Sequence, residues 1–108
     1  MPWIELTVAG LFEIAWALGL KYTYGWTRLL PSVLTVIGMA ASFYFLSRAL
    51  KVIPIGTAYA IWTGIGAVGT AILGIIIFKE PLNAARVVCV AMIVAGIVGL
   101  KLTSTAPE

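Results

Sequence analysis

The chain has 108 residues, of which 62% are hydrophobic and 10% are charged, with a net charge of +3 and a mean hydropathy of +1.10. A soluble domain of this size has too little interior to bury so much apolar surface, so the composition excludes an ordinary soluble fold. It contains no basic run interleaved with aromatic residues, which disfavours a nucleic-acid binder. With no His and a single cysteine, Cys89, we expect no metal site, no cofactor and no internal disulfide.

Apolar segments cover most of the chain and predict an all-α integral membrane protein with a single domain, 1–108. They span about residues 3–20, 29–46, 55–78 and 82–100. Helices are expected because an open strand cannot satisfy its backbone polar groups in lipid. The short connections predict antiparallel neighbours. We expect a frayed tail from Thr103 to Glu108, and no signal peptide at the start, where no Lys or Arg precedes the first apolar run.

The first segment carries an acid, Glu13, near the middle of its apolar run. A charged carboxylate at that depth is costly unless it faces a polar cavity or holds a cation, and such acids often mark ion paths. Helical spacing predicts that Gly10, Trp16 and Ala17 share its face, with Gly10 lining the pocket and Trp16 offering a ring face or an indole N–H. The alternative is a protonated Glu13 that hydrogen-bonds a neighbouring helix.

Polar groups on the next two segments are candidates to complete the site. Ser42 lies at mid-depth in the second segment and could bond Glu13 or a substrate, but a serine that bonds its own helix is a common alternative. Tyr59 and Trp62 lie on one face of the third segment, and their polar tips could donate to Glu13. An interfacial position for Trp62 is less suitable, because it lies deep in its segment.

Two glycines of the third segment, Gly64 and Gly66, predict a kink or hinge, although glycines also permit close helix packing without motion. The fourth segment has small or adaptable residues, including Cys89, Met92 and Gly96, and no acid or base in its interior. It is expected to serve packing or dimerisation. Arg86, near its start, is expected to extend to the lipid headgroups.

The basic residues are almost evenly divided between the two membrane sides, so they set little preference for orientation. One side would carry Arg48, Lys51 and Lys101, and the other Lys21, Arg28, Lys79 and Arg86. Dual insertion with antiparallel pairing is one interpretation. The other is a single topology set by the one-charge difference or the N-terminal amine. An antiparallel dimer would supply the inverted symmetry that transporters often use and this chain lacks internally.

Several blocks of sequence resemble the small multidrug resistance family, in its guanidinium exporter subtype. They are residues 9–17 (AGLFEIAWA), 19–23 (GLKYT), 28–33 (RLLPSV) and 54–69 (PIGTAYAIWTGIGAVG). The resemblance implies a dual-topology antiparallel homodimer in the bacterial inner membrane that exchanges protons for guanidinium and small guanidinyl cations. It also implies a shared proton and substrate site at Glu13, lined by Trp16, Ser42, Tyr59 and Trp62.

The same resemblance implies a helix bend at Gly64 and Gly66 and a dimer contact that includes Gly96. Cys89 departs from the glycine expected in that contact in the drug-exporting branch, so close packing there is in question. No nucleophile–base pair or phosphate loop can be assembled, so we expect no enzyme. The rivals are a polyaromatic drug exporter, a small ion channel and a membrane subunit that transports nothing.

Overall fold

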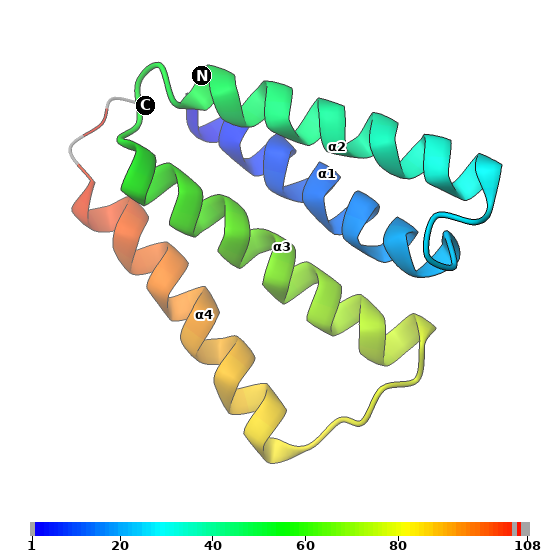
Figure 1. The fold of residues 1–108 in the computed structure, drawn as a ribbon. Helices are drawn as coiled ribbons and strands as arrows, with labels where there is room; N and C mark the ends of the chain where they lie inside the picture. Colours follow the sequence, from blue (N-terminus) through cyan, green and yellow to red (C-terminus); the bar gives the residue numbers. More distant parts are fainter. Residues whose placement is uncertain (1, 105, 107–108) are drawn as a thin grey trace.

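The computed structural model describes residues 2–104 and 106, and it is built from α-helices alone over that part of the chain. The helices are α1 (Pro2–Tyr22), α2 (Leu29–Ala49), α3 (Ile55–Ile77) and α4 (Ala84–Thr103) (Figure 1). Each is long and apolar enough to cross a membrane. At about 1.5 Å of rise per residue, 20 to 23 residues span roughly 30–35 Å, the thickness of bilayer hydrocarbon. The predicted all-α fold with four such helices is confirmed.

Helices α1 and α2 extend beyond the apolar runs that predicted them, α3 ends one residue earlier than predicted, and α4 is displaced along the chain. It begins at Ala84 because Asn83 caps it, its side-chain oxygen accepting the Arg86 backbone N–H at 2.8 Å. It ends at Thr103, so the prediction of a frayed tail is wrong for that residue. Ala106 packs against the core, and residues 105, 107 and 108 lie outside the described part of the chain.

A tight turn at residues 23–27 reverses the chain between α1 and α2. The buried Thr23 hydroxyl donates to the Leu20 carbonyl at 2.7 Å and accepts the Trp26 N–H at 3.2 Å. The backbone is left-handed at Tyr24, Gly25 and Trp26, with φ of 46°, 69° and 69°. Glycine adopts this conformation freely, whereas the two aromatic residues adopt it at a cost. Because of this turn, α2 packs against α1 and runs antiparallel to it.

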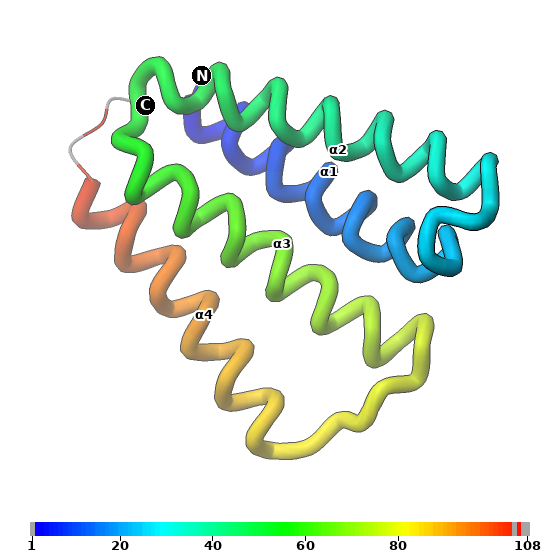
Figure 2. The backbone as a smooth tube through the Cα atoms, viewed as in Figure 1, coloured from blue at the N-terminus to red at the C-terminus, as the bar shows by residue number. Residues whose placement is uncertain are grey.

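The helices form a flat, open arrangement and not a closed bundle (Figure 1). The Cα atoms extend over 43 × 35 × 17 Å. Helix α1 packs against α2 and α3, whereas the backbone of α4 comes close to α3 alone. Figure 2 shows α4 leaving α3 toward the connection at residues 78–83. No residue of α4 is fully buried, so most of this helix is left for lipid or another protein.

The buried core lies at one end of the molecule, where α1 and α3 begin and α2 ends. Its members are Leu6, Ala9, Ala49, Ile53, Ala58, Ile61 and Trp62. Their side chains come from three helices and the connection between α2 and α3. This end therefore holds α1, α2 and α3 in register, while the opposite end is less tightly filled.

Candidate functional site

Glu13 lines a groove between α1 and α3 with a volume of about 490 Å³. The groove begins near the middle of α1 and continues to the connection between α3 and α4. We call it the α1–α3 groove, and the residues that define it here are Glu13, Ala17, Lys21, Thr63, Gly66, Thr70, Gly74, Glu80 and Arg86. Acidic groups lie toward both of its ends, and most of the wall between them is apolar or hydroxylated.

The carboxyl group of Glu13 lies directly against the backbone of α3 at Gly66. A Cβ atom at that position would overlap the carboxyl group, so glycine is what permits the close approach. The Oε1 atom is buried and has no hydrogen-bond partner within the described chain, and the same is true of the Thr70 hydroxyl in this groove. A charged, unpaired carboxylate is costly in an apolar surrounding, so this one requires a proton or a cation.

Ser42 connects three helices instead of bonding its own helix or Glu13. Its hydroxyl is fully buried, donates to the Ala9 carbonyl of α1 at 2.7 Å and accepts the Trp62 indole N–H of α3 at 2.9 Å. The predicted donation from Trp62 to Glu13 and the predicted self-bonding of Ser42 are therefore both wrong in this structure. A hydroxyl can donate and accept at once, so Ser42 satisfies the indole without the acid. Ala9 lies one helical turn before Glu13, which places this junction beside the acid.

Aromatic rings form a continuous row across α1, α2 and α3. Ring centroids are 6.3 Å apart for Trp16 and Phe43, 5.7 Å for Phe43 and Trp62, and 5.6 Å for Tyr59 and Trp62. Trp62 is buried, whereas Tyr59 is exposed. The structure therefore brings the three predicted aromatic residues together. Phe43 was missed by sequence reasoning, and its only signal was its place beside Ser42.

The predicted common face of α1 is divided between two neighbouring helices. Trp16 packs over Gly38 of α2 and lines a second cavity, of about 340 Å³, between α1 and α2. Glu13 turns toward α3, and Gly10 also faces α3, where it meets Ile65. Residues three apart differ by about 60° around a helix, which is enough to direct them to different neighbours. Within one chain, Trp16 and Glu13 do not line the same cavity.

The glycines of the predicted hinge lie inside an uninterrupted helix. Helix α3 continues through Gly64 and Gly66. Gly66 receives Glu13, and a Cβ at Gly64 would come within 2.9 Å of Ile97 of α4. Gly66 thus allows α3 to pack closely on α1, and Gly64 allows it to pack closely on α4. The hinge remains a prediction.

The residues of α4 predicted to pack in a dimer are exposed in the single chain. They are Cys89, Met92 and Gly96, and a Cβ at Gly96 would have no neighbour within 4 Å. Nothing within the described chain occupies this face. Their role in dimerisation remains a prediction.

Charged residues that sequence reasoning did not assign to the site lie at the far end of the α1–α3 groove. Arg86 Nη2 donates to a Glu80 carboxylate oxygen at 2.7 Å and to the Ala71 carbonyl at 3.0 Å. Lys21 Nζ lies 4.7 Å from the centre of the Phe78 ring. We predicted that Arg86 extends to the lipid headgroups, and the structure corrects this. Its guanidinium group binds Glu80 and the Ala71 carbonyl of α3 instead. The available signal was the pair of opposite charges, Glu80 and Arg86, on either side of residues 81–85 (PLNAA).

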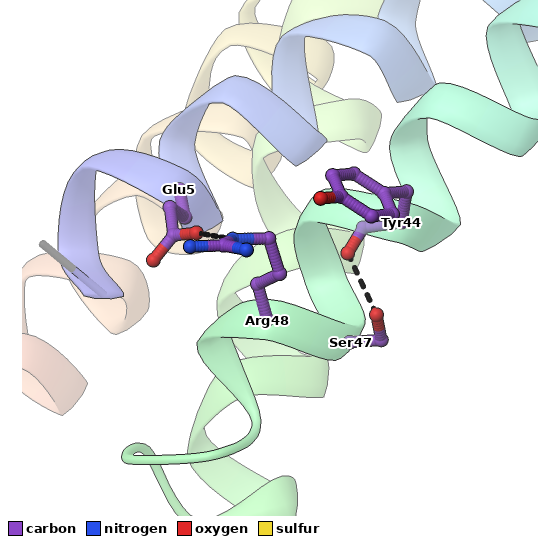
Figure 3. A network of polar contacts seen from close by, with 4 residues as sticks. All are labelled: Glu5, Tyr44, Ser47 and Arg48. Carbon is purple, nitrogen blue, oxygen red and sulfur yellow. Dashed lines mark hydrogen bonds and ion pairs between the residues drawn. The ribbon is translucent and has the colours of Figure 1, made fainter.

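A second Arg–Glu pair lies at the opposite end of the molecule, outside the groove. Figure 3 shows Arg48 of α2 donating through Nε to the Glu5 carboxylate of α1, close to Tyr44. The Arg48 guanidinium carbon lies 5.9 Å from the centre of the Tyr44 ring. Ser47, in the same view, bonds the Tyr44 carbonyl of its own helix at 2.7 Å. This pair joins the first turn of α1 to the last turn of α2.

Comparison with known proteins agrees with these observations. The profile of the family described as Small Multidrug Resistance protein matches residues 1–93. A guanidinium exporter of Proteus vulgaris is 64% identical over 104 residues, covering 96% of this chain and 100% of the relative. Guanidinium exporters of Yersinia pseudotuberculosis and Salmonella typhimurium are 57% and 55% identical over 104 residues, covering 96% of this chain and 100% and 99% of the relatives. This chain is therefore a member of the small multidrug resistance family, a multi-pass membrane transporter by fold and kinship.

Proposed function

We propose that this protein is a proton-coupled antiporter that exports guanidinium and small guanidinyl cations across the bacterial inner membrane. The observation that carries the proposal is Glu13, near the middle of α1, whose Oε1 atom is buried in a groove and without a hydrogen-bond partner in the described chain. The names of its relatives, guanidinium exporters at 55–64% identity, support the choice of cation.

The chemistry of the cation suits this acid. Guanidinium is planar and weakly hydrated, and its N–H groups form a fork that matches the two oxygens of a carboxylate. A carboxylate in an apolar groove binds either a proton or a cation, because the neutral acid has no charge with which to hold the cation. Binding of one therefore excludes the other, and this exclusion is the basis of exchange.

The transporting unit in this proposal is an antiparallel homodimer. Three features support it: the near balance of Lys and Arg on the two sides, the flat arrangement of the helices and the absence of fully buried residues on α4. Met92 and Gly96 lie on the exposed surface of α4, where a second copy would pack. The two copies of Glu13 would then face a shared site, in which charging one acid disfavours charging the other.

The aromatic row and the serine junction shape this site. Trp62 and Trp16 would border the cation with their ring faces, and Tyr59 would contribute its exposed ring. Ser42 would hold the Trp62 indole in position, and Gly66 would let the acid lie close to the backbone of α3, whereas the space at Gly10 is filled by Ile65. If both acids release protons for one cation, each cycle moves one net charge, which is worth about 2.3 kcal/mol per 100 mV.

Proton movement driven by a guanidinium gradient in proteoliposomes tests the proposal. The wild type is expected to exchange, and Glu13→Gln is expected to lose exchange by at least about 100-fold, because the amide binds neither a proton nor the cation. Glu5→Gln, which removes another carboxylate of the same helix, is the matched control and should retain exchange. A wild type that moves no protons in response to guanidinium contradicts the proposal.

Two measurements distinguish the rival functions. A channel needs no titratable acid to alternate, so ion flux that persists in Glu13→Gln would favour it. A broader drug exporter would exchange quaternary ammonium and polyaromatic cations as fast as guanidinium.

The stoichiometry is tested separately. A measured coupling ratio of one proton per guanidinium would rule out the net charge movement in each cycle but would leave the proposed antiport intact.

A further inference from the structure

The far end of the α1–α3 groove already contains a guanidinium group bound to a carboxylate. The group belongs to Arg86, and its partner is Glu80 at 2.7 Å. Both side chains line the same groove as Glu13. Arg86 thus presents to Glu80 the same chemical group that the proposed substrate carries.

Glu80 is held in position by close packing. A Cβ at Gly74 of α3 would come within 2.6 Å of a Glu80 carboxylate oxygen, so the carboxylate rests on the helix backbone. The backbone N–H of Glu80 donates to the Gly74 carbonyl at 3.2 Å. The Glu80 side chain is nevertheless 40% exposed, so a small cation can reach it from outside.

Arg86 can leave Glu80 without losing all its partners. The same Nη2 atom that bonds Glu80 also donates to the Ala71 carbonyl at 3.0 Å. Its side chain is 26% exposed. The cost of displacing it from Glu80 is therefore limited to one partly exposed ion pair, and such pairs are weak.

We propose that Glu80 is an outer binding site for the guanidinium substrate and that Arg86 is an internal competitor which occupies this site when substrate is absent. The inference rests on the proposed function. An arriving cation replaces the Arg86 guanidinium at Glu80 and then moves along the groove past Thr70 to Glu13. Gly74 lies eight positions after Gly66 on α3, so the two sites lie roughly 12 Å apart along the helix. In an antiparallel dimer, one Glu80 would stand at each membrane face.

Opposite effects of the two partners distinguish this inference from a purely structural ion pair. The measurement is the KM for guanidinium in proteoliposome exchange. Glu80→Gln removes the outer site and is expected to raise the KM about three- to fivefold, whereas Arg86→Gln removes the competitor and is expected to lower it by a similar factor. Loss of a structural contact alone would shift the KM in the same direction in both variants. Because the two changes also alter the charge of the groove in opposite senses, the charge-conserving variant Arg86→Lys separates competition at Glu80 from a general effect of charge.

A third variant and a control complete the experiment. Arg86→Lys keeps the charge but replaces the fork with a point charge, so its KM should lie between those of wild type and Arg86→Gln. If Arg86→Gln does not fold, Arg86→Lys is used instead, and a KM unchanged from wild type overturns the inference. Glu5→Gln removes the acid of the other Arg–Glu pair and should leave the KM unchanged.

The outcomes separate this inference from the function on which it rests. A wild type without guanidinium-driven exchange contradicts the antiporter itself. An active wild type with equal shifts, or no shifts, in the Glu80 and Arg86 variants retains the antiporter and overturns the outer site.

Discussion

The two ends of this molecule differ in how their space is filled. At the end where α1 and α3 begin, Leu6, Ala49 and Ile53 are almost completely buried. At the other end, α1 and α3 enclose a groove of about 490 Å³ with charged residues at its mouth. Glu13 lies at the boundary between them. The tightly packed part of the molecule and the open groove are therefore separated along the helix axes.

The two Arg–Glu pairs repeat this contrast with the same residue types. Arg48 and Glu5 join the end of α2 to the start of α1, and neither lines the α1–α3 groove or the cavity between α1 and α2. Arg86 and Glu80 border the α1–α3 groove and share a hydrogen-bond network with the α3 backbone. The first ion pair is expected to be dispensable for transport, whereas the second lies in the groove through which we propose that the substrate passes.

After Glu13→Gln, Gly66→Ala is the change expected to have the largest effect on the grooved end. The new Cβ would overlap the Glu13 carboxyl group, which must turn away because it is the mobile end of its side chain. Exchange in proteoliposomes should fall about tenfold or more, because the carboxyl group leaves its place on α3. The melting temperature should change little, because turning the side chain away avoids the overpacking that costs about 1–3 kcal/mol when it cannot relax.

Gly56→Ala is the matched control for that experiment. It makes the same substitution in the same helix, at a position where a Cβ has no neighbour within 4 Å. Equal exchange in the two alanine variants would show that the contact between Gly66 and Glu13 does not matter for transport.

Ser42→Ala is expected to have an intermediate effect, mainly on stability. It removes the acceptor of the Trp62 indole and the bond to Ala9, and it leaves a buried N–H group without a partner. We expect a loss of about 1 kcal/mol, measured by thermal unfolding in detergent. Ser47→Ala removes a serine that bonds only its own helix and should change the melting temperature less. A larger effect at Ser47 would contradict the importance of the three-helix junction.

Glu5→Gln is expected to have the smallest effect. The pair with Arg48 lies at the outer ends of its helices, where water and salt screen the charges. Melting temperature and guanidinium exchange should both stay close to the wild-type values. A loss of exchange comparable to that of Glu13→Gln would show that the division of the molecule into two ends is wrong.

Much of the fold was predictable from the sequence because lipid restricts the choices. Four apolar runs separated by short polar segments lead to four antiparallel helices, and only the ends of the helices differed. Glu13 could likewise be singled out from the sequence as a candidate site, since an acid in an apolar run is costly in any arrangement. The family blocks around it pointed to the same position.

The partners of the side chains were not predictable in this way. Ser42 was expected to bond either Glu13 or its own helix, yet it joins Ala9 to Trp62. Trp16 was placed beside Glu13, yet it lines the cavity between α1 and α2. Arg86 was assigned to lipid headgroups, yet it binds Glu80. In each case the residue type allowed several partners.

The sequence by itself determined that this chain forms membrane-spanning helices with one acid in the apolar interior, because burial costs depend on residue type and depth. Only the tertiary structure decided that Glu13 rests on Gly66 and that Glu80 holds Arg86 at the end of the same groove. The physical reason is angular: a rotation of about 60° around a helix axis changes which neighbour a side chain meets, and helix packing sets that rotation.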